Sequence, residues 1–127
     1  MKFFHYAKDG GNESTVWGWW LIEAKKYFSI ALLCFEDGSR EAFHEHAFNS
    51  VSWVLKGALF EHFIDQGGNF YQPSIFPVIT RRNTMHKVSS KGRTWVLTFR
   101  GPWHDKWREW LPEEQRYQTL THGRKVV

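Results

Sequence analysis

The first hundred residues alternate short apolar segments with turn signals, and this rhythm constrains the fold more than any other feature of the chain. The turn signals include Asp37–Gly38, residues 66–69 and residues 89–92. Segments typical of strands lie at 16–23, 27–35, 41–46, 50–56, 58–64, 70–72, 75–80, 85–88 and 94–100. Short strands separated by turns at intervals of about 8–12 residues are typical of sandwiches and barrels. The sequence therefore predicts an all-β fold that forms a single domain over residues 1–127.

The character of the chain changes after Pro102. Trp103, Trp107 and Trp110 recur at spacings of four and three residues, which place them on one face of a helix. Pro112 limits such a helix to a short one. We therefore expect a short Trp-rich C-terminal helix, or an extension, that covers one side of a barrel.

The positive charge of the chain is spread along the sequence. The net charge is +4 and the pI is about 9.3. The basic residues include Lys25–Lys26, Arg81–Arg82, Lys91, Arg93 and Arg124–Lys125. A nucleic-acid-binding surface concentrates such charge, so nucleic acid is not expected as a partner, whereas an anionic small ligand stays open.

The cysteine content and the length of the apolar runs indicate in which cellular compartment the protein is expected. The single cysteine, Cys34, excludes an internal disulfide and lies in the apolar run SIALLCF. We expect a buried thiol and a reducing compartment. The N-terminal stretch lacks the apolar region of a signal peptide, and no apolar run reaches the ~18 residues of a membrane helix. A cytoplasmic protein without a membrane span is expected.

Two histidines one residue apart, His44 and His46, stand between Gly38 and Gly57. Side chains two residues apart in a strand point to the same face of the sheet. The two imidazoles are therefore either polar residues on an open sheet face or inward ligands of a metal ion.

The spacing around these histidines resembles the first motif of the cupin superfamily, which is glycine, five residues, H-x-H, three or four residues, a glutamate, six residues and glycine. The glutamate position is Ser50 here, and Asn49 precedes it, so the carboxylate ligand is missing. The second motif of the family supplies one more histidine, for which the stretch TRRNTMHKVSS offers His86. Arg81 and Asn83 stand there in place of a proline and a glycine. The resemblance implies a jelly-roll barrel with a metal site formed by His44, His46 and His86.

The stretch from Phe43 to Trp110 is also similar to a group of small bacterial and phage cupin-like proteins. These proteins carry F-H-x-H, a strand that ends in L-x-G, a later H-R/K-V, and W-x-L-x-F-x-G-P before a Trp-rich end. An acidic residue is common in that group at the position of Asn49. The similarity implies the fold but no single activity.

Further polar residues are candidates for the pocket or for hydrogen bonds to the metal ligands. Asn49, Ser50 and Ser52 are close enough in sequence to accept a ring N–H from a ligand histidine. Neighbours in a strand point in opposite directions, so one of Glu61 and His62 faces the interior. The full candidate set is Asn49, Ser50, Ser52, Glu61, His62, Tyr71 and Arg82. The remaining histidines, expected at the surface, are His5, His104 and His122.

Three imidazoles without a carboxylate favour iron, zinc, nickel or copper over magnesium, calcium or manganese. Three neutral histidines leave coordination positions of a divalent metal open for Lewis-acid chemistry or for activation of oxygen or water. The resemblance to three-His cupins therefore implies an enzyme that acts on a small molecule. Its chemistry would be dioxygenase-like, or isomerase-like or lyase-like without a redox step.

Two other roles remain open. A non-catalytic barrel would bind a small ligand, such as a nucleotide or sugar derivative, as a phage or bacterial accessory protein that sequesters a host small molecule. The missing glutamate and the missing second-motif glycine favour this alternative. Cupins are often dimers, and the exposed strands of a half-open barrel favour pairing, so a homodimer is expected.

Overall fold

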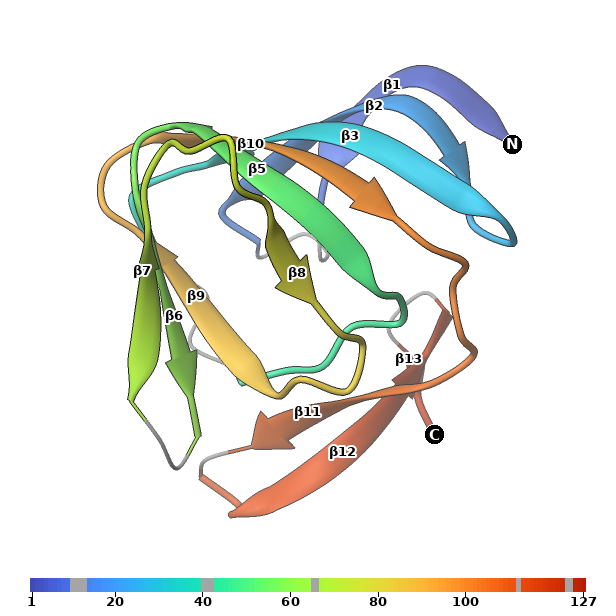
Figure 1. Cartoon of the computed structure of the whole chain (residues 1–127). Helices are drawn as coiled ribbons and strands as arrows, with labels where there is room; N and C mark the ends of the chain where they lie inside the picture. Colours follow the sequence, from blue (N-terminus) through green and yellow to red (C-terminus); the bar gives the residue numbers. More distant parts are fainter. Residues whose placement is uncertain (10–13, 40–42, 65–66, 112, 123–124) are drawn as a thin grey trace.

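The computed structural model describes residues 1–9, 14–39, 43–64, 67–111, 113–122 and 125–127. Nearly all of its regular structure is strand (Figure 1). The strands are β1 (Lys2–Lys8), β2 (Val16–Ala24), β3 (Phe28–Phe35), β4 (Gly38–Ser39), β5 (Ser50–Lys56), β6 (Leu59–Phe63), β7 (Gly68–Tyr71), β8 (Val78–Thr80), β9 (His86–Ser90), β10 (Thr94–Arg100), β11 (Trp107–Leu111), β12 (Arg116–Thr121) and β13 (Lys125–Val126). The prediction of an all-β fold is confirmed.

The strands form three antiparallel sheets that enclose a barrel (Figure 1). The largest sheet has the order β1-β2-β3-β10-β5-β8, the second β4-β9-β6-β7, and the third β11-β12-β13. In Figure 1 the β6, β7 and β9 strands form the left wall and the β11–β12 hairpin closes the bottom. Isolated bridges join His44 to His86 of β9 and to Glu109 of β11. The segment that carries His44 therefore links the second sheet to the third.

Side chains that alternate inward along the strands build the core. The main cluster consists of Trp20, Ala31, Leu33, Val54, Leu59 and Val96. A second cluster, formed by Ala47, Phe48, Trp107 and Leu120, packs the segment after His46 against the C-terminal hairpin. The hairpin therefore completes the hydrophobic interior near the histidines.

The outer face of the six-stranded sheet is also apolar. The strand register places one row of outward side chains across five strands, namely Tyr6, Trp19, Leu32, Leu97 and Trp53. A second row contains Ile30, Phe99, Val51 and Ile79. An antiparallel sheet usually presents polar residues on its solvent face, so this sheet has the pattern of one that is covered on both faces.

The predicted C-terminal helix is wrong. Trp107 and Trp110 belong to β11, which pairs with β12 along its whole length, and Trp110 packs on Tyr117. The backbone hydrogen bonds of this ladder, together with burial of Trp107, outweigh a helical spacing carried by a few tryptophans. Pro112, which was expected to end the helix, lies outside the described residues.

Two further expectations differ from the structure. The predicted strand over 41–46 is not formed in its described part, where only the bridges at His44 occur; residues 41 and 42 lie outside the described residues, as does Gln66 of a predicted turn. The N-terminal strand β1 was not predicted. Its Phe4 has a φ of 49°, and this kink interrupts the two-residue alternation by which strands are detected.

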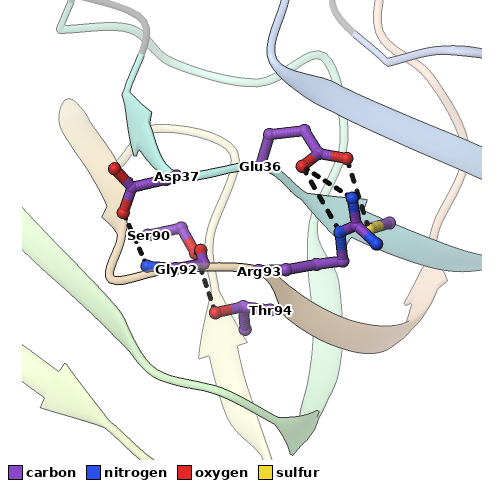
Figure 2. Close-up of polar contacts among 7 residues, drawn as sticks. Glu36, Asp37, Ser90, Gly92, Arg93 and Thr94 are labelled. Atoms are coloured by element: carbon purple, nitrogen blue, oxygen red, sulfur yellow. Dashed lines mark hydrogen bonds and ion pairs between the residues drawn. The ribbon is translucent and has the colours of Figure 1, made fainter.

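A polar network fixes the turn that joins β9 to β10 (Figure 2). Asp37 Oδ1 accepts a hydrogen bond of 2.6 Å from the backbone N–H of Gly92, and the Ser90 and Thr94 hydroxyls lie 2.8 Å apart. Arg93 pairs with Glu36 at the surface. These contacts hold the register of β9, which begins with His86.

Cys34 is buried and free, as expected. Burial of its thiol raises its pKa, the Glu36 carboxylate raises it further, and Arg93 acts in the opposite direction. In the described part of the chain, no helix has the length and apolar content that a membrane crossing requires.

Candidate metal centre

Backbone hydrogen bonds fix the segment that carries His44 and His46 between β4 and β5. His44 exchanges two of them with His86, at 2.8 and 3.0 Å, and Glu45 N–H donates to the Arg108 carbonyl at 2.8 Å. Consecutive residues are thus anchored to different sheets, β9 on one side and β11 on the other. The segment is bound as firmly as a strand although it forms no ladder of its own.

The three histidines expected as metal ligands meet inside the barrel. One ring nitrogen from each of His44, His46 and His86 lies within 4.8 Å of the other two. The ring centroids are 4.9–5.2 Å apart and the ring planes meet at 68–81°. This edge-on triangle is an arrangement that can hold a metal ion.

Glu61 lies behind His86 and sets its orientation. Its Oε2 is 2.6 Å from His86 Nδ1, while Tyr71 Oη and Asn69 Nδ2 donate to Oε1 at 2.8 and 3.3 Å. Burial opposes ionisation of Glu61, but the hydrogen bonds from His86, Tyr71 and Asn69 outweigh it and lower its pKa. Burial and the bond to Glu61 raise the pKa of Tyr71 to about 12. The carboxylate therefore keeps the His86 proton on Nδ1 and leaves the Nε2 lone pair available.

His46 is held in its neutral form. Burial lowers its pKa well below the ordinary value, and electrostatic interactions with His44, His86 and Arg100 lower it further. Its Nδ1 and the Nε2 of His86 are buried and have no hydrogen-bond partner among the described residues. Neutral imidazole is the state that binds metals.

The histidines form part of the wall of a cavity of about 540 Å³. This volume lies in the usual range for small-molecule pockets, about 300–1,000 Å³. Glu61, Tyr71, Ser50 and Ser52 also line it, and the Ser52 hydroxyl donates to Thr98 Oγ1 at 2.9 Å. Four of the candidate pocket residues therefore do face the same space as the histidines.

The other three candidates lie elsewhere. His62 is exposed, because it alternates with the inward Glu61 along β6. Asn49 is exposed, and its Oδ1 accepts a hydrogen bond of 2.7 Å from the backbone N–H of Arg82. Asn49 and Arg82 line a separate surface groove, in which Arg82 is half-buried.

A second histidine–carboxylate pair borders the cavity. His5 Nε2 lies 3.2 Å from Glu23 Oε1, although the two are not aligned for a hydrogen bond, and the His5 ring stacks on Trp20 at 5.1 Å. His5 was expected at the surface, but its side chain is half-buried, 26% exposed, with its Nε2 buried. The alternation in HYAK, after the kink at Phe4, was the only sequence signal for it. His104 and His122 are exposed, as expected.

Arg100 is another cavity residue that the sequence did not reveal. It forms a two-armed ion pair with Asp9, at 3.0 and 2.7 Å, and its guanidinium lies 4.5 Å from the Phe48 ring centroid. Within the part of the chain that the structure describes, its Nε has no acceptor, and neither do the indole N–H groups of Trp20 and Trp103. The cavity wall therefore contains buried donors that lack acceptors.

Comparison with known proteins places the fold. No family model matches the chain, and no curated protein matches it. Solved structures do resemble it. A cupin superfamily protein from Desulfitobacterium hafniense is 22% identical and has a TM-score of 0.58, over 74% of this chain and 84% of the other.

Two further solved structures resemble the chain at lower identity. A sugar phosphate isomerase of the cupin superfamily from Silicibacter pomeroyi is 11% identical with a TM-score of 0.66, over 98% and 87%. Ectoine synthase from P. lautus is 13% identical with a TM-score of 0.62, over 76% and 70%. The barrel seen here, with its three-sheet enclosure, is therefore the fold of the cupin superfamily.

Proposed function

We propose that this protein is a metal-dependent enzyme that acts on a small molecule in the barrel cavity, with His44, His46 and His86 as the metal ligands. The observation that carries the proposal is the meeting of one ring nitrogen from each histidine within 4.8 Å of the others, in a cluster where His46 Nδ1 and His86 Nε2 are buried and have no hydrogen-bond partner among the described residues. A buried polar atom without a partner destabilises the fold by about 1–3 kcal/mol. A bound cation would remove that cost.

The donor set fits a divalent transition metal. Three imidazoles without a carboxylate suit iron, zinc, nickel or copper. Glu61 bonds the far nitrogen of His86, so it acts on the ligand rather than on the metal. When bound, such a metal supplies a Lewis acid with open coordination positions.

The cavity wall indicates the kind of molecule and the kind of step. Trp20, Trp103 and Arg100 line the cavity, and each has an N–H group without an acceptor among the described residues, which suits a molecule rich in oxygen acceptors. His5, whose Nε2 lies 3.2 Å from Glu23 Oε1 at the edge of the cavity, is the candidate general acid or base. A proton-transfer reaction is therefore favoured over the dioxygenase-like one, and an isomerase of the same fold, named as acting on sugar phosphates, is compatible with it.

Metal analysis tests the metal centre. Protein purified without chelator should contain about one equivalent of metal, and the His44→Ala/His46→Ala variant should contain none. His104→Ala/His122→Ala is the matched control, because both histidines are exposed, and it should keep its metal. Wild-type protein that stays metal-free and folded after addition of iron, zinc, nickel and copper would contradict the proposal.

Two assays separate the reaction types. A panel of small hydroxy acids, keto acids and sugar phosphates is incubated in D₂O with metal-loaded enzyme, and carbon-bound deuterium is read by NMR. Oxygen uptake with the same panel and with small thiols tests the dioxygenase-like alternative. Deuterium incorporation that is lost in His5→Gln while the metal is retained supports proton transfer, and oxygen uptake without exchange would overturn it.

A non-catalytic barrel is the second candidate function. It would use the same cavity to sequester a small molecule, as a bacterial or phage accessory protein. The buried donors that have no acceptor among the described residues support ligand binding in either case. Turnover in the assays above decides between the two.

We further propose that the protein forms a homodimer through the outer face of the six-stranded sheet. The outward residues Tyr6, Trp19, Phe28, Phe99 and Ile79 are 39–68% exposed. An aromatic side chain presents about 150–250 Å², so these five and their half-buried neighbours expose on the order of 700 Å². A standard interface buries about 800 Å² of each partner. A second copy of this largely apolar face matches both the area and the chemistry.

Light scattering during size-exclusion chromatography tests the homodimer. The wild type should elute with twice the mass of one chain, and Trp19→Lys/Phe99→Lys should elute as a monomer. Phe70→Lys, an exposed aromatic on the other wall, is the control and should remain dimeric. A monomeric wild type at about 50 μM, well above the Kd of a standard interface, would contradict the proposal.

A further inference from the structure

A second pocket lies beside the histidine segment, between the turn at 81–83 and the stretch 104–108. Its volume is about 490 Å³. Glu45 lines both this pocket and the barrel cavity, so the segment that holds His44 and His46 forms a wall between the two. We call this second pocket the basic groove.

The basic groove concentrates positive charge. Its charged residues are Arg81, Arg82, Lys106, Arg108 and Glu45. Glu45 accepts two hydrogen bonds from the Arg108 guanidinium, at 3.0 and 3.1 Å, and this pair neutralises itself. The other three cations have no carboxylate partner within the described residues, and the adjacent Asp105 pairs with His122. The groove thus holds three uncompensated positive charges in a chain whose net charge is +4.

The two arginines lie on a turn that is already fixed. The Thr84 N–H donates to the Arg81 carbonyl at 3.0 Å and closes the turn. The Arg82 N–H donates to Asn49 at 2.7 Å, and the Arg82 carbonyl accepts from the His46 N–H at 3.3 Å. A ligand at the groove would therefore meet cations whose backbone does not have to be ordered on binding.

We propose that the basic groove binds a small molecule that carries a phosphate or diphosphate group. Three cations from two segments suit an anion with two or more negative charges, because one carboxylate would leave most of the charge unpaired. The planar guanidinium of arginine matches phosphate geometry. Asn83 and His104 line the same groove and add hydrogen-bonding groups.

The size of the groove favours a small molecule over a nucleic acid. A volume of about 490 Å³ fits a drug-sized or nucleotide-sized ligand. Nucleic-acid binding follows a stripe of many cations along a surface, whereas the remaining lysines and arginines of this chain are scattered. The groove binds its anion independently of the metal centre, since no residue of the triad lines it.

Calorimetric titration of the full chain with inorganic pyrophosphate, in metal-free buffer, tests the proposal. The wild type should bind with 1:1 stoichiometry. Arg81→Ala/Lys106→Ala should weaken binding roughly tenfold or more, because charge-assisted hydrogen bonds are lost. Lys26→Ala/Lys91→Ala removes the same charge from exposed positions outside both pockets, and it should leave the affinity unchanged.

Further variants and ligands in the same titration show where pyrophosphate binds. His44→Ala/His46→Ala should retain pyrophosphate binding even though it loses metal, which keeps a failure here distinct from a failure of the metal centre. Equal weakening in both lysine-containing double variants would indicate general charge screening and overturn the site. Absence of binding at millimolar pyrophosphate would overturn it as well. A single-stranded oligonucleotide that binds more tightly through the same residues would replace the small ligand with a nucleic acid.

Discussion

Glu61 Oε2 lies 2.6 Å from His86 Nδ1 in the interior of the barrel, and both side chains are less than 10% exposed. The contact directs the other ring nitrogen of His86 toward His44 and His46. No carboxylate belongs to the triangle of histidines, but Glu61 contributes one from behind it, through its contact with the His86 ring.

Glu61→Gln should therefore weaken metal binding while it preserves the shape of the site. A neutral amide accepts the His86 proton less strongly, so the imidazole becomes a poorer ligand. Substitutions of this kind typically lower metal affinity about 10–100-fold. Competitive titration with a zinc chelator measures the change. His62→Gln alters the next, exposed residue of β6 and should have no effect; equal affinities for all three proteins would contradict the role assigned to Glu61.

The meeting of the three histidines was largely predictable because they carry a spacing signal. The glycines around His44 and His46 fix the length of chain between turns, and His86 is the one histidine in the later region where a third ligand was expected. The partner of His86 was not predictable to a single residue. Alternation along β6 left Glu61 and His62 as equivalent choices, and only the pairing of β6 with β9 decides which of them points inward.

The termini of the fold were missed for a different reason. β1 and the β11–β12 hairpin depend on pairing between strands, and such contacts override local periodicity. His5 and Arg100 belong to the cavity through β1 and β10, whose inward faces meet only when the barrel closes. The hydrophobic pattern of one amino-acid sequence does not show which strands meet when the barrel closes.

Gly57 and Gly38 distinguish two ways in which replacing a glycine destabilises the fold, namely backbone strain and a steric clash of the added Cβ. Both have φ of 96°, but a Cβ at Gly38 meets nothing within 4 Å, whereas at Gly57 it would lie 2.7 Å from the Arg93 carbonyl and collide with the Thr94 hydroxyl. Gly38→Ala should lower the free energy of unfolding by about 1–2 kcal/mol through backbone strain. Gly57→Ala should lower it by roughly 3 kcal/mol or more, because a steric clash is added. Urea unfolding measures both, and equal losses would contradict the packing at Gly57.

The Asp9–Arg100 pair should stabilise the fold far more than the Glu36–Arg93 pair shown in Figure 2. The Arg100 side chain is 6% exposed, and Asp9→Asn leaves its charge buried without a partner. The expected loss is about 2–3 kcal/mol, below the range for fully buried pairs because Asp9 is partly solvated.

Glu36→Gln is the matched control, since both partners of that pair are exposed, and it should change stability by less than about 1 kcal/mol. Thermal unfolding followed by circular dichroism compares the two variants. A smaller loss for Asp9→Asn than for Glu36→Gln would show that the Arg100 guanidinium reaches solvent.

Cys34 should make the fold less stable at alkaline pH. Burial raises the pKa of its thiol in the folded protein, while an unfolded thiol has a pKa of about 8.5. Above that pH the unfolded chain ionises and the folded chain does not, so the free energy of unfolding falls as pH rises toward the folded pKa. Urea unfolding at about pH 7.5 and pH 9.5 should show a larger loss for the wild type than for Cys34→Ala, in which all other titrating groups remain. Equal losses in the two proteins would mean that the thiol ionises as readily in the folded barrel as in the unfolded chain.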